Sequence, residues 1–365
     1  DTGVEADPDY RAYLMDGMRP ATWTHERPGR WITEPTGATS HLPVKTLHLT
    51  DEGLQDTAAP LDRSVASPAH CGADGGEYCA IWLGPEMPGD QRQDDALSVC
   101  FDSGPLAQQM DILGAPRLRL RLACDKPQGQ IAVRLNHIHP DGASARITYG
   151  VLNLSHRDSA EHPQAMAPGA MTDITLDLDH IAYRIPKGHR LRVSISTAYW
   201  PLLWPAPEAA EVTLSSGQID LPQRPTSGGD EYSFAPPTSA AAWVTETLRP
   251  ENHIRRQEID RVTGIVSLII EDDFGKLRDA DHGLIAGSVA REVWRIHPDD
   301  PLSAKGTCHW TEELERDDII LRTETRSQMW SDATHFHLTA RLEAYENDKL
   351  IYERDVTKDI KRHFM

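Results

Sequence analysis

The chain has 365 residues, with 37 basic and 56 acidic side chains and a formal net charge of −19. This length is too great for one compact β-sandwich and predicts two or three domains. The acidic balance argues against nucleic acid or an anionic membrane as the main partner, and no apolar run approaches the roughly 20 residues that cross a bilayer.

Residues 1–43 are dense in proline, tryptophan and arginine. Proline fixes φ and removes an amide donor, which excludes a helix or a central strand. Trp23 and Trp31 are large apolar side chains for which a loose linker has no use. We therefore predict an extended strap packed on a neighbouring surface, with residues 10–15 as a strand that leads into it.

Short segments typical of β-strands recur between residues 44 and 220, and arginine alternates with leucine from Arg117 to Leu122. This period of two marks a half-buried strand. Turn sequences such as Pro140-Asp141-Gly142 separate the segments, so we predict a two-sheet jelly-roll β-sandwich over residues 44–220. The expected strands are 44–49, 78–83, 97–101, 117–123, 130–135, 145–152, 174–178 and 191–197.

Serine, glycine and proline dominate residues 215–240, and we place a linker at 221–240. Residues 241–365 then contain long alternating segments, with Glu346 to Lys349 as a hairpin turn. They predict a second, antiparallel β unit, with a short helix near residues 358–363.

A serine hydrolase needs a nucleophile in Gly-x-Ser-x-Gly, placed on a strand-to-helix turn. The nearest strings surround Ser144 and Ser288, and both lack the flanking glycines. No alternating strand–helix pattern is present that could hold a triad. We therefore predict no catalytic residue in this chain.

His137 and His139 form a His-x-His pair at a strand end, so both rings lie on one face in a geometry that metal sites use. A cupin jelly-roll would add a glutamate, which does not follow here. Structural histidines near a turn are favoured for this pair and for His335 and His337, so we predict no metal and no cofactor. A metal-dependent jelly-roll enzyme stays open as an alternative, whereas His189 is expected to cap its turn by hydrogen bonds.

Five cysteines do not form a disulfide framework in a chain of this size, and their odd number leaves at least one unpaired. We expect reduced thiols and a cytoplasmic protein. Cys71 and Cys79 do not have Cys-x-x-Cys spacing, so idle thiols are favoured over a metal site, a disulfide or a reactive thiol. The sequence begins at Asp1 without a signal-peptide pattern, and we expect that processing or an expression boundary made this end.

The segment from Tyr199 to Pro205 contains Trp200 and Trp204 and is rigid and aromatic. Packing of this loop against a neighbouring domain is favoured. Because tryptophan also stacks on sugars, a free-standing carbohydrate-binding β-sandwich module is the alternative function.

The order of motifs from Pro8 to Leu214 resembles the C-terminal jelly-roll of the CocE/NonD hydrolases, which are relatives of X-Pro dipeptidyl-peptidase. The motifs are Arg27-Pro28-Gly29-Arg30-Trp31, Asp90-Gln91-Arg92, Phe101-Asp102-Ser103-Gly104-Pro105-Leu106, His139-Pro140-Asp141-Gly142 and Lys187-Gly188-His189-Arg190-Leu191. The resemblance implies a galactose-binding-like jelly-roll fold. Residues 241–365 extend beyond the jelly-roll of this family.

In that family an α/β-hydrolase domain with a Ser-Asp-His triad precedes the jelly-roll. The resemblance implies that this chain is the non-catalytic C-terminal region of such a hydrolase and is inactive by itself. The expected partner is the upstream hydrolase domain, and a homo-oligomer is a further expectation. The resemblance assigns the contact with that domain to the strap residues Trp23, Arg27, Arg30 and Trp31.

Loops of the family jelly-roll help to wall the substrate pocket of the hydrolase domain. The resemblance implies this role for Tyr78, Cys79, Ile81 and Trp82, for which the alternative is simple strand core. Trp200 and Trp204 are further candidates for the pocket wall or for an interdomain contact.

Overall fold

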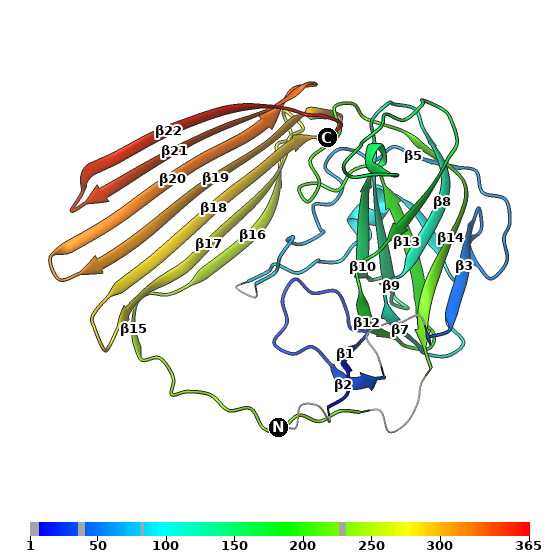
Figure 1. Ribbon diagram of the computed structural model, residues 1–365, viewed down its shortest axis with the longest axis horizontal. Helices are drawn as coiled ribbons and strands as arrows, with labels where there is room; N and C mark the ends of the chain where they lie inside the picture. Colours follow the sequence, from blue (N-terminus) through cyan, green and yellow to red (C-terminus); the bar gives the residue numbers. More distant parts are fainter. Residues whose placement is uncertain (1–6, 36–40, 82–83, 226–230) are drawn as a thin grey trace. The chain divides into compact units, whose positions relative to one another are not determined.

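The computed structural model describes residues 7–35, 41–81, 84–225 and 231–365. These residues form two compact units (Figure 1). The first, here called the sandwich unit, comprises Asp1–Ser67, Pro88–Thr197 and Ala210–Thr238. The second, the C-terminal unit, comprises Pro68–Met87, Ala198–Ala209 and Ser239–Met365. The predicted mostly-β fold is confirmed. Within the described ranges, every helix is too short or too polar to span a membrane.

The sandwich unit contains two sheets. The ten-stranded sheet has the order β11-β8-β14-β7-β12-β1-β2, with β3 and β5 paired to β14 and β4 paired to β3. Its strands are β1 (Tyr10–Asp16), β2 (Gly29–Glu34), β3 (Val44–Thr50), β4 (Gly53–Gln55), β5 (Arg63–Val65), β7 (Met110–Gly114), β8 (Arg117–Cys124), β11 (Thr172–Asp177), β12 (Ile181–Ile185) and β14 (Val212–Arg224). The four-stranded sheet has the order β10-β9-β13-β6, with β6 (Val99–Asp102), β9 (Gln130–Ile138), β10 (Ser144–Asn153) and β13 (Arg190–Ser196).

The core of the sandwich unit lies between the inward-facing side chains of the two sheets. Along β8, Leu118, Leu120 and Leu122 are buried in this core while the arginines between them face outward. Arg117 pairs with Asp177 on β11 at 2.5 Å, so the outer face carries ion pairs between neighbouring strands. The predicted alternation of this strand is confirmed.

The predicted strap folds into the sandwich unit as two strands. β1 pairs antiparallel with β2 and parallel with β12, which attaches the hairpin to the ten-stranded sheet. Leu14 and Ile32 are buried with Leu113 in a small separate core. Residues 1–6 and 36–40 of the predicted strap lie outside the described residues.

The predicted linker begins too early, because β14 continues through Arg224. Leu214, Ile219 and Leu221 of this strand are fully buried. Glycine at position 217 lets a neighbouring side chain pack closely against the strand, since a Cβ atom at this position would lie 2.7 Å from Cδ2 of Leu120. Residues 215–224, whose composition is typical of a linker, therefore lie in a central strand. Residues 226–230 lie outside the described part of the chain.

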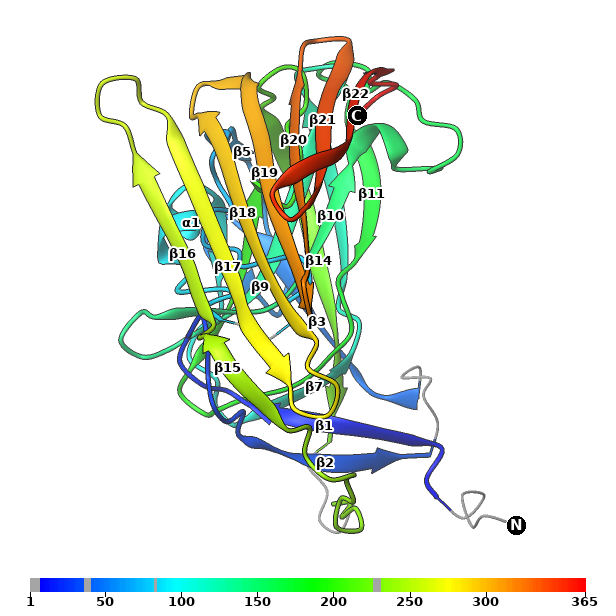
Figure 2. The ribbon, with the colours of Figure 1, turned by 90° about the vertical axis from the view of Figure 1, so that its left-hand side faces the viewer.

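The C-terminal unit contains one eight-stranded antiparallel sheet, which faces the viewer in Figure 2. Its strands are β15 (Thr245–Arg249), β16 (Asn252–Ile259), β17 (Val266–Asp279), β18 (Ile285–His297), β19 (Asp300–Arg316), β20 (Ile319–Ser331), β21 (His335–Glu346) and β22 (Lys349–Lys361).

The predicted hairpin between β21 and β22 is confirmed, with Asn347 and Asp348 at positive φ. The predicted terminal helix is wrong. β22 continues to Lys361, because its residues pair along the length of β21 as far as His335.

The packing of β8 generates a stability test. We expect Leu122→Ala to lower the free energy of unfolding of the sandwich unit by about 2–5 kcal/mol, because it leaves a cavity in the core. The control, Arg121→Ala, removes an exposed pair with Asp173 and should cost less than about 1 kcal/mol. Urea denaturation followed by circular dichroism measures both, and equal losses would contradict the inward assignment of Leu122.

Candidate functional site

Strand β9 has two faces with different chemistry. Ile131, Val133 and Leu135 point into the sandwich core. Arg134 and Asn136 point the other way, toward the short helix α1 (Arg92–Ala96). Because side chains alternate between the two faces of a strand, the polar side chains of β9 belong to two separate clusters, one on each face.

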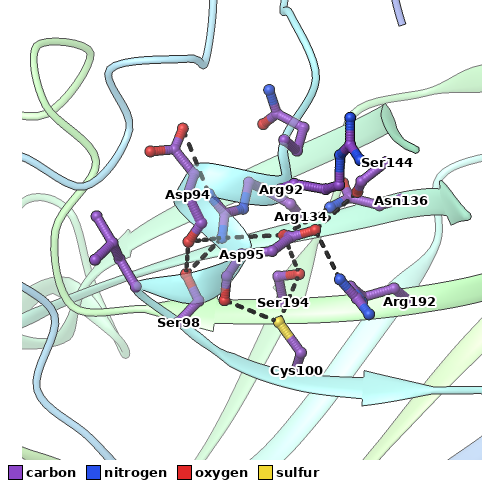
Figure 3. Close-up of polar contacts among 12 residues, drawn as sticks. Arg92, Asp94, Asp95, Ser98, Cys100, Arg134, Asn136, Ser144, Arg192 and Ser194 are labelled. Atoms are coloured by element: carbon purple, nitrogen blue, oxygen red, sulfur yellow. Dashed lines mark hydrogen bonds and ion pairs between the residues drawn. The ribbon is translucent and has the colours of Figure 1, made fainter. Parts of the chain in front are cut away.

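On the outer face, the carboxylate of Asp95 collects four hydrogen bonds, as Figure 3 shows. One oxygen accepts from Nδ2 of Asn136 at 3.0 Å and from Oγ of Ser194 at 2.7 Å. The other accepts from Oγ of Ser144 at 2.7 Å and from Nη1 of Arg192 at 3.0 Å. A single buried side chain of α1 thereby joins β9, β10 and β13.

Two arginines supply the opposite charge to this cluster. The side chain of Arg134 is fully buried, lies 3.6 Å from the carboxylate of Asp95 and donates to Oγ of Ser98 at 2.6 Å. Arg192 makes a bidentate pair with Asp102 at 2.6 and 2.8 Å, and these bonds raise the pKa of Arg192. Burial raises the pKa of the neighbouring Cys100 thiol, which keeps it protonated and unreactive at neutral pH. We interpret this cluster as a structural anchor for α1.

On the inner face, His137 and His139 continue the row of core side chains at the end of β9. Their rings stack at 4.2 Å between centroids. Nε2 of His137 lies 2.6 Å from Nδ1 of His189, which lies in the turn between β12 and β13. Burial, together with the other two histidines, lowers the pKa of His137 to about 3, so its ring is neutral at pH 7. The side chain of His189, expected to cap its turn, instead meets a histidine of the neighbouring strand.

The predicted pocket-wall residues lie in the loop formed by residues 68–87 of the C-terminal unit. Tyr78 is 85% exposed, Ile81 is 55% exposed and Cys79 is exposed. The described part of the strand expected at 78–83 is a loop, because the amides of Glu77 and Ile81 bond to Glu86 within the same loop instead of to a strand. The strand-core alternative is therefore wrong for the exposed residues of this segment. Trp82 lies outside the described residues.

Trp200 and Trp204 belong to the core of the C-terminal unit. Trp200 is 1% exposed and contacts the rings of Trp204 and Trp294 edge to face, at 5.3 and 5.9 Å. Nε1 of Trp204 donates to Oγ of Ser331 at 2.9 Å. Because its ring is enclosed, Trp200 offers no stacking face to a sugar, which weakens the carbohydrate-module alternative.

The four strap candidates, Trp23, Arg27, Arg30 and Trp31, differ in their contacts and exposure. Trp31 packs edge to face against Tyr13 at 5.5 Å, and the Arg27 guanidinium lies 5.9 Å from the ring centroid of Tyr183. Arg30 lies half-buried on β2 beside them. Trp23 is 41% exposed. Arg27 therefore links the strap to β12, Trp31 packs within the strap, and Trp23 and the exposed part of Trp31 present apolar surface.

Sequence reasoning missed the role of Asp95 and the third member of the histidine cluster. No local pattern marks Asp95, and the hydrogen-bond partners of its carboxylate lie 41 to 99 positions away. The alternation along β9 would have placed His137 and His139 on the core face. Nothing local would have brought His189 to them, since strand pairing does that.

The anchor on the outer face generates a second prediction. Asp95→Ala should lower the free energy of unfolding of the sandwich unit by about 3–5 kcal/mol, because it removes the nearest carboxylate from the buried Arg134 and leaves four hydrogen-bond donors without their acceptor. The control is Asp173→Ala, which removes an exposed carboxylate paired with Arg121 and should cost no more than about 1 kcal/mol. Urea denaturation of both variants provides the measurement, and a loss at Asp95 as small as that at Asp173 would refute the anchor.

The burial of Trp200 generates a third prediction. Trp200→Ala should destabilise the C-terminal unit by about 3–5 kcal/mol, because it empties a large volume in that core. Tyr78→Ala, at an exposed position, should change stability by less than about 0.5 kcal/mol. Thermal unfolding of the two variants tests this, and an unchanged melting temperature for Trp200→Ala would contradict the observed packing.

The chain matches a known protein family over most of its length. The X-Pro dipeptidyl-peptidase C-terminal non-catalytic domain matches residues 2–246. The cocaine esterase of Rhodococcus sp. (strain MB1 Bresler) is 23% identical over 122 residues, which is 32% of this chain and 21% of the esterase. The chain thus spans about a fifth of the length of that relative.

Solved structures to which the chain is similar include an α-amino acid ester hydrolase, at 18% identity and a TM-score of 0.43, covering 49% of this chain and 36% of that protein. They also include a CocE/NonD family hydrolase from Staphylococcus aureus, at 10% identity and a TM-score of 0.45, covering 61% and 42%. Because the family match spans most of its residues, this chain belongs to the X-Pro dipeptidyl-peptidase C-terminal non-catalytic domain family.

Proposed function

We propose that this chain is the C-terminal part of a CocE/NonD-type serine hydrolase, cleaving Xaa-Pro peptides, esters or amides. In this proposal it packs on the upstream α/β-hydrolase domain and helps to shape the substrate pocket of that domain. The family assignment carries the first half of the proposal. The exposed apolar side chains of the loop at residues 68–87 carry the second.

The loop is held firmly at its base and is apolar at its exposed residues. Arg255 donates to the carboxylate of Glu77 at 3.0 Å and to the carbonyl of Gly76 at 3.1 Å. Tyr78 and Ile81, which follow, are largely exposed. An anchored loop that presents an aromatic and an aliphatic side chain loses little entropy on docking, which suits a pocket wall.

The strap presents a second apolar surface, which supports the proposed contact with the hydrolase domain. Trp23 and Trp31 are 41% and 39% exposed, although both are held in a strap that pairs with the sandwich unit. Exposed tryptophans are enriched at protein interfaces, where they contribute large contact areas. We assign this surface to the hydrolase domain.

The sequence contains no Gly-x-Ser-x-Gly, so the nucleophile must come from the upstream domain. This chain by itself should leave p-nitrophenyl acetate and Ala-Pro-p-nitroanilide uncleaved. The longer gene product, with the reading frame ahead of Asp1 included, should cleave one of them. Turnover by the chain alone, or a reading frame without a hydrolase domain, would overturn the proposal.

The pocket-wall role has its own test in the longer protein. Tyr78→Ser with Ile81→Ser should raise KM or change the preference between substrates about tenfold, which corresponds to about 1.4 kcal/mol of lost contact. The matched control is Val262→Ser, which changes an aliphatic side chain that is 95% exposed on another turn of the same unit. Identical kinetics for both variants would argue against the wall while leaving the family assignment intact.

A further inference from the structure

We propose that His137, His139 and His189 form a binding site for one divalent transition-metal ion, with Zn²⁺ as the expected occupant. The site lies in the sandwich unit, where the inner face of β9 ends and the strap crosses it. It is independent of the hydrolase function proposed above.

The three rings converge from separate parts of the fold. One nitrogen of each can be chosen so that all three lie within 4.8 Å of one another. Ligand nitrogens of a tetrahedral zinc ion lie about 3.3 Å apart, given Zn–N distances of about 2.0–2.1 Å. To reach that spacing, the 2.6 Å contact between His137 and His189 needs to open by roughly 0.7 Å, and a separation of up to 4.8 Å needs to close by roughly 1.5 Å. His189 can supply this movement, because it lies in a partly exposed turn.

The outer nitrogens are engaged in the way that metal-bound histidines require. Nε2 of His139 lies 3.0 Å from the carbonyl of Met18, which can only accept, so this nitrogen carries the proton. In the neutral ring, Nδ1 of His139 then holds the lone pair. Nδ1 of His137 lies 3.0 Å from the Tyr183 hydroxyl, so its Nε2 is the inward nitrogen. Such partners orient the ligand rings of metal sites.

The surroundings fix the rings and leave an entry. Gly17 of the strap packs so closely that a Cβ atom would lie 2.7 Å from Cε1 of His137. The side chain of Tyr183 is buried beside it. His137 and His139 are buried, whereas His189 is partly exposed. A metal ion could therefore enter beside His189, where a water molecule would complete the coordination.

The donor set decides the kind of ion. Neutral imidazole favours Zn²⁺, Ni²⁺ and Cu²⁺ over Mg²⁺ and Ca²⁺, which prefer oxygen ligands. A hydrogen bond between His137 and His189 would account for their 2.6 Å contact without any metal. It involves only two of the three rings, and binding of one ion by all three requires the His139 ring to rotate out of its 4.2 Å stack on His137, because a metal lies in the plane of each imidazole that it binds.

The test uses the full chain after treatment with EDTA and removal of the chelator. We expect equilibrium dialysis against ZnCl2 with elemental analysis to give one zinc ion per chain, and Co²⁺ to give the visible absorption bands of a four-coordinate site. Zinc should also raise the melting temperature, since it binds only the folded state. These three readouts need no variant.

Two substitutions locate the ion. His189→Gln, in the turn, and His139→Gln should each weaken Zn²⁺ binding at least about tenfold and abolish the Co²⁺ bands, with far-UV circular dichroism unchanged. The matched control is His335→Gln with His337→Gln, the other His-x-His pair, which should bind as the wild type does. Absence of stoichiometric zinc in the wild type overturns the site. Binding that survives both substitutions, or that is lost in the control, does so too.

Discussion

The buried carboxylate of Asp95 is the interaction on which the order of the sandwich unit depends. It accepts hydrogen bonds from β9, β10 and β13 and lies opposite the fully buried Arg134, so that α1 is fastened to the outer face of the four-stranded sheet. A buried ion pair is costly unless its hydrogen bonds are satisfied. Here four donors converge on one carboxylate, and this requirement selects one register for three strands at once.

The same register sets the inner face of β9. Once Arg134 and Asn136 are fixed outward, the alternate residues must point into the core, and the last of these are His137 and His139. The pairing of β13 with β9 then carries the turn before β13, and with it His189, to the end of the sandwich. The anchor on one face and the histidine cluster on the other are thus consequences of one strand alternation.

The proposed contacts with a hydrolase domain use side chains that these anchors leave outside. Tyr78 and Ile81 project from a loop whose base is bonded to Arg255, and Trp23 projects from a strap that is paired to β12 through β1. Apolar groups that a rigid scaffold holds at the surface can dock without a large loss of conformational entropy. In this proposal the partner is a hydrolase domain, because the matched family is a non-catalytic domain.

The sequence by itself determined the β class, most strands and the family, because a period of two and the order of turn motifs are local properties. The hairpin at Asn347 could be predicted for the same reason. Tertiary structure alone decided that Gly217 lies in a central strand, that Trp200 fills a core and that Asp95 joins three strands. It also decided the meeting of His189 with His137. Each of these depends on partners far away in the chain, and strand pairing, which no local pattern encodes, brings them together.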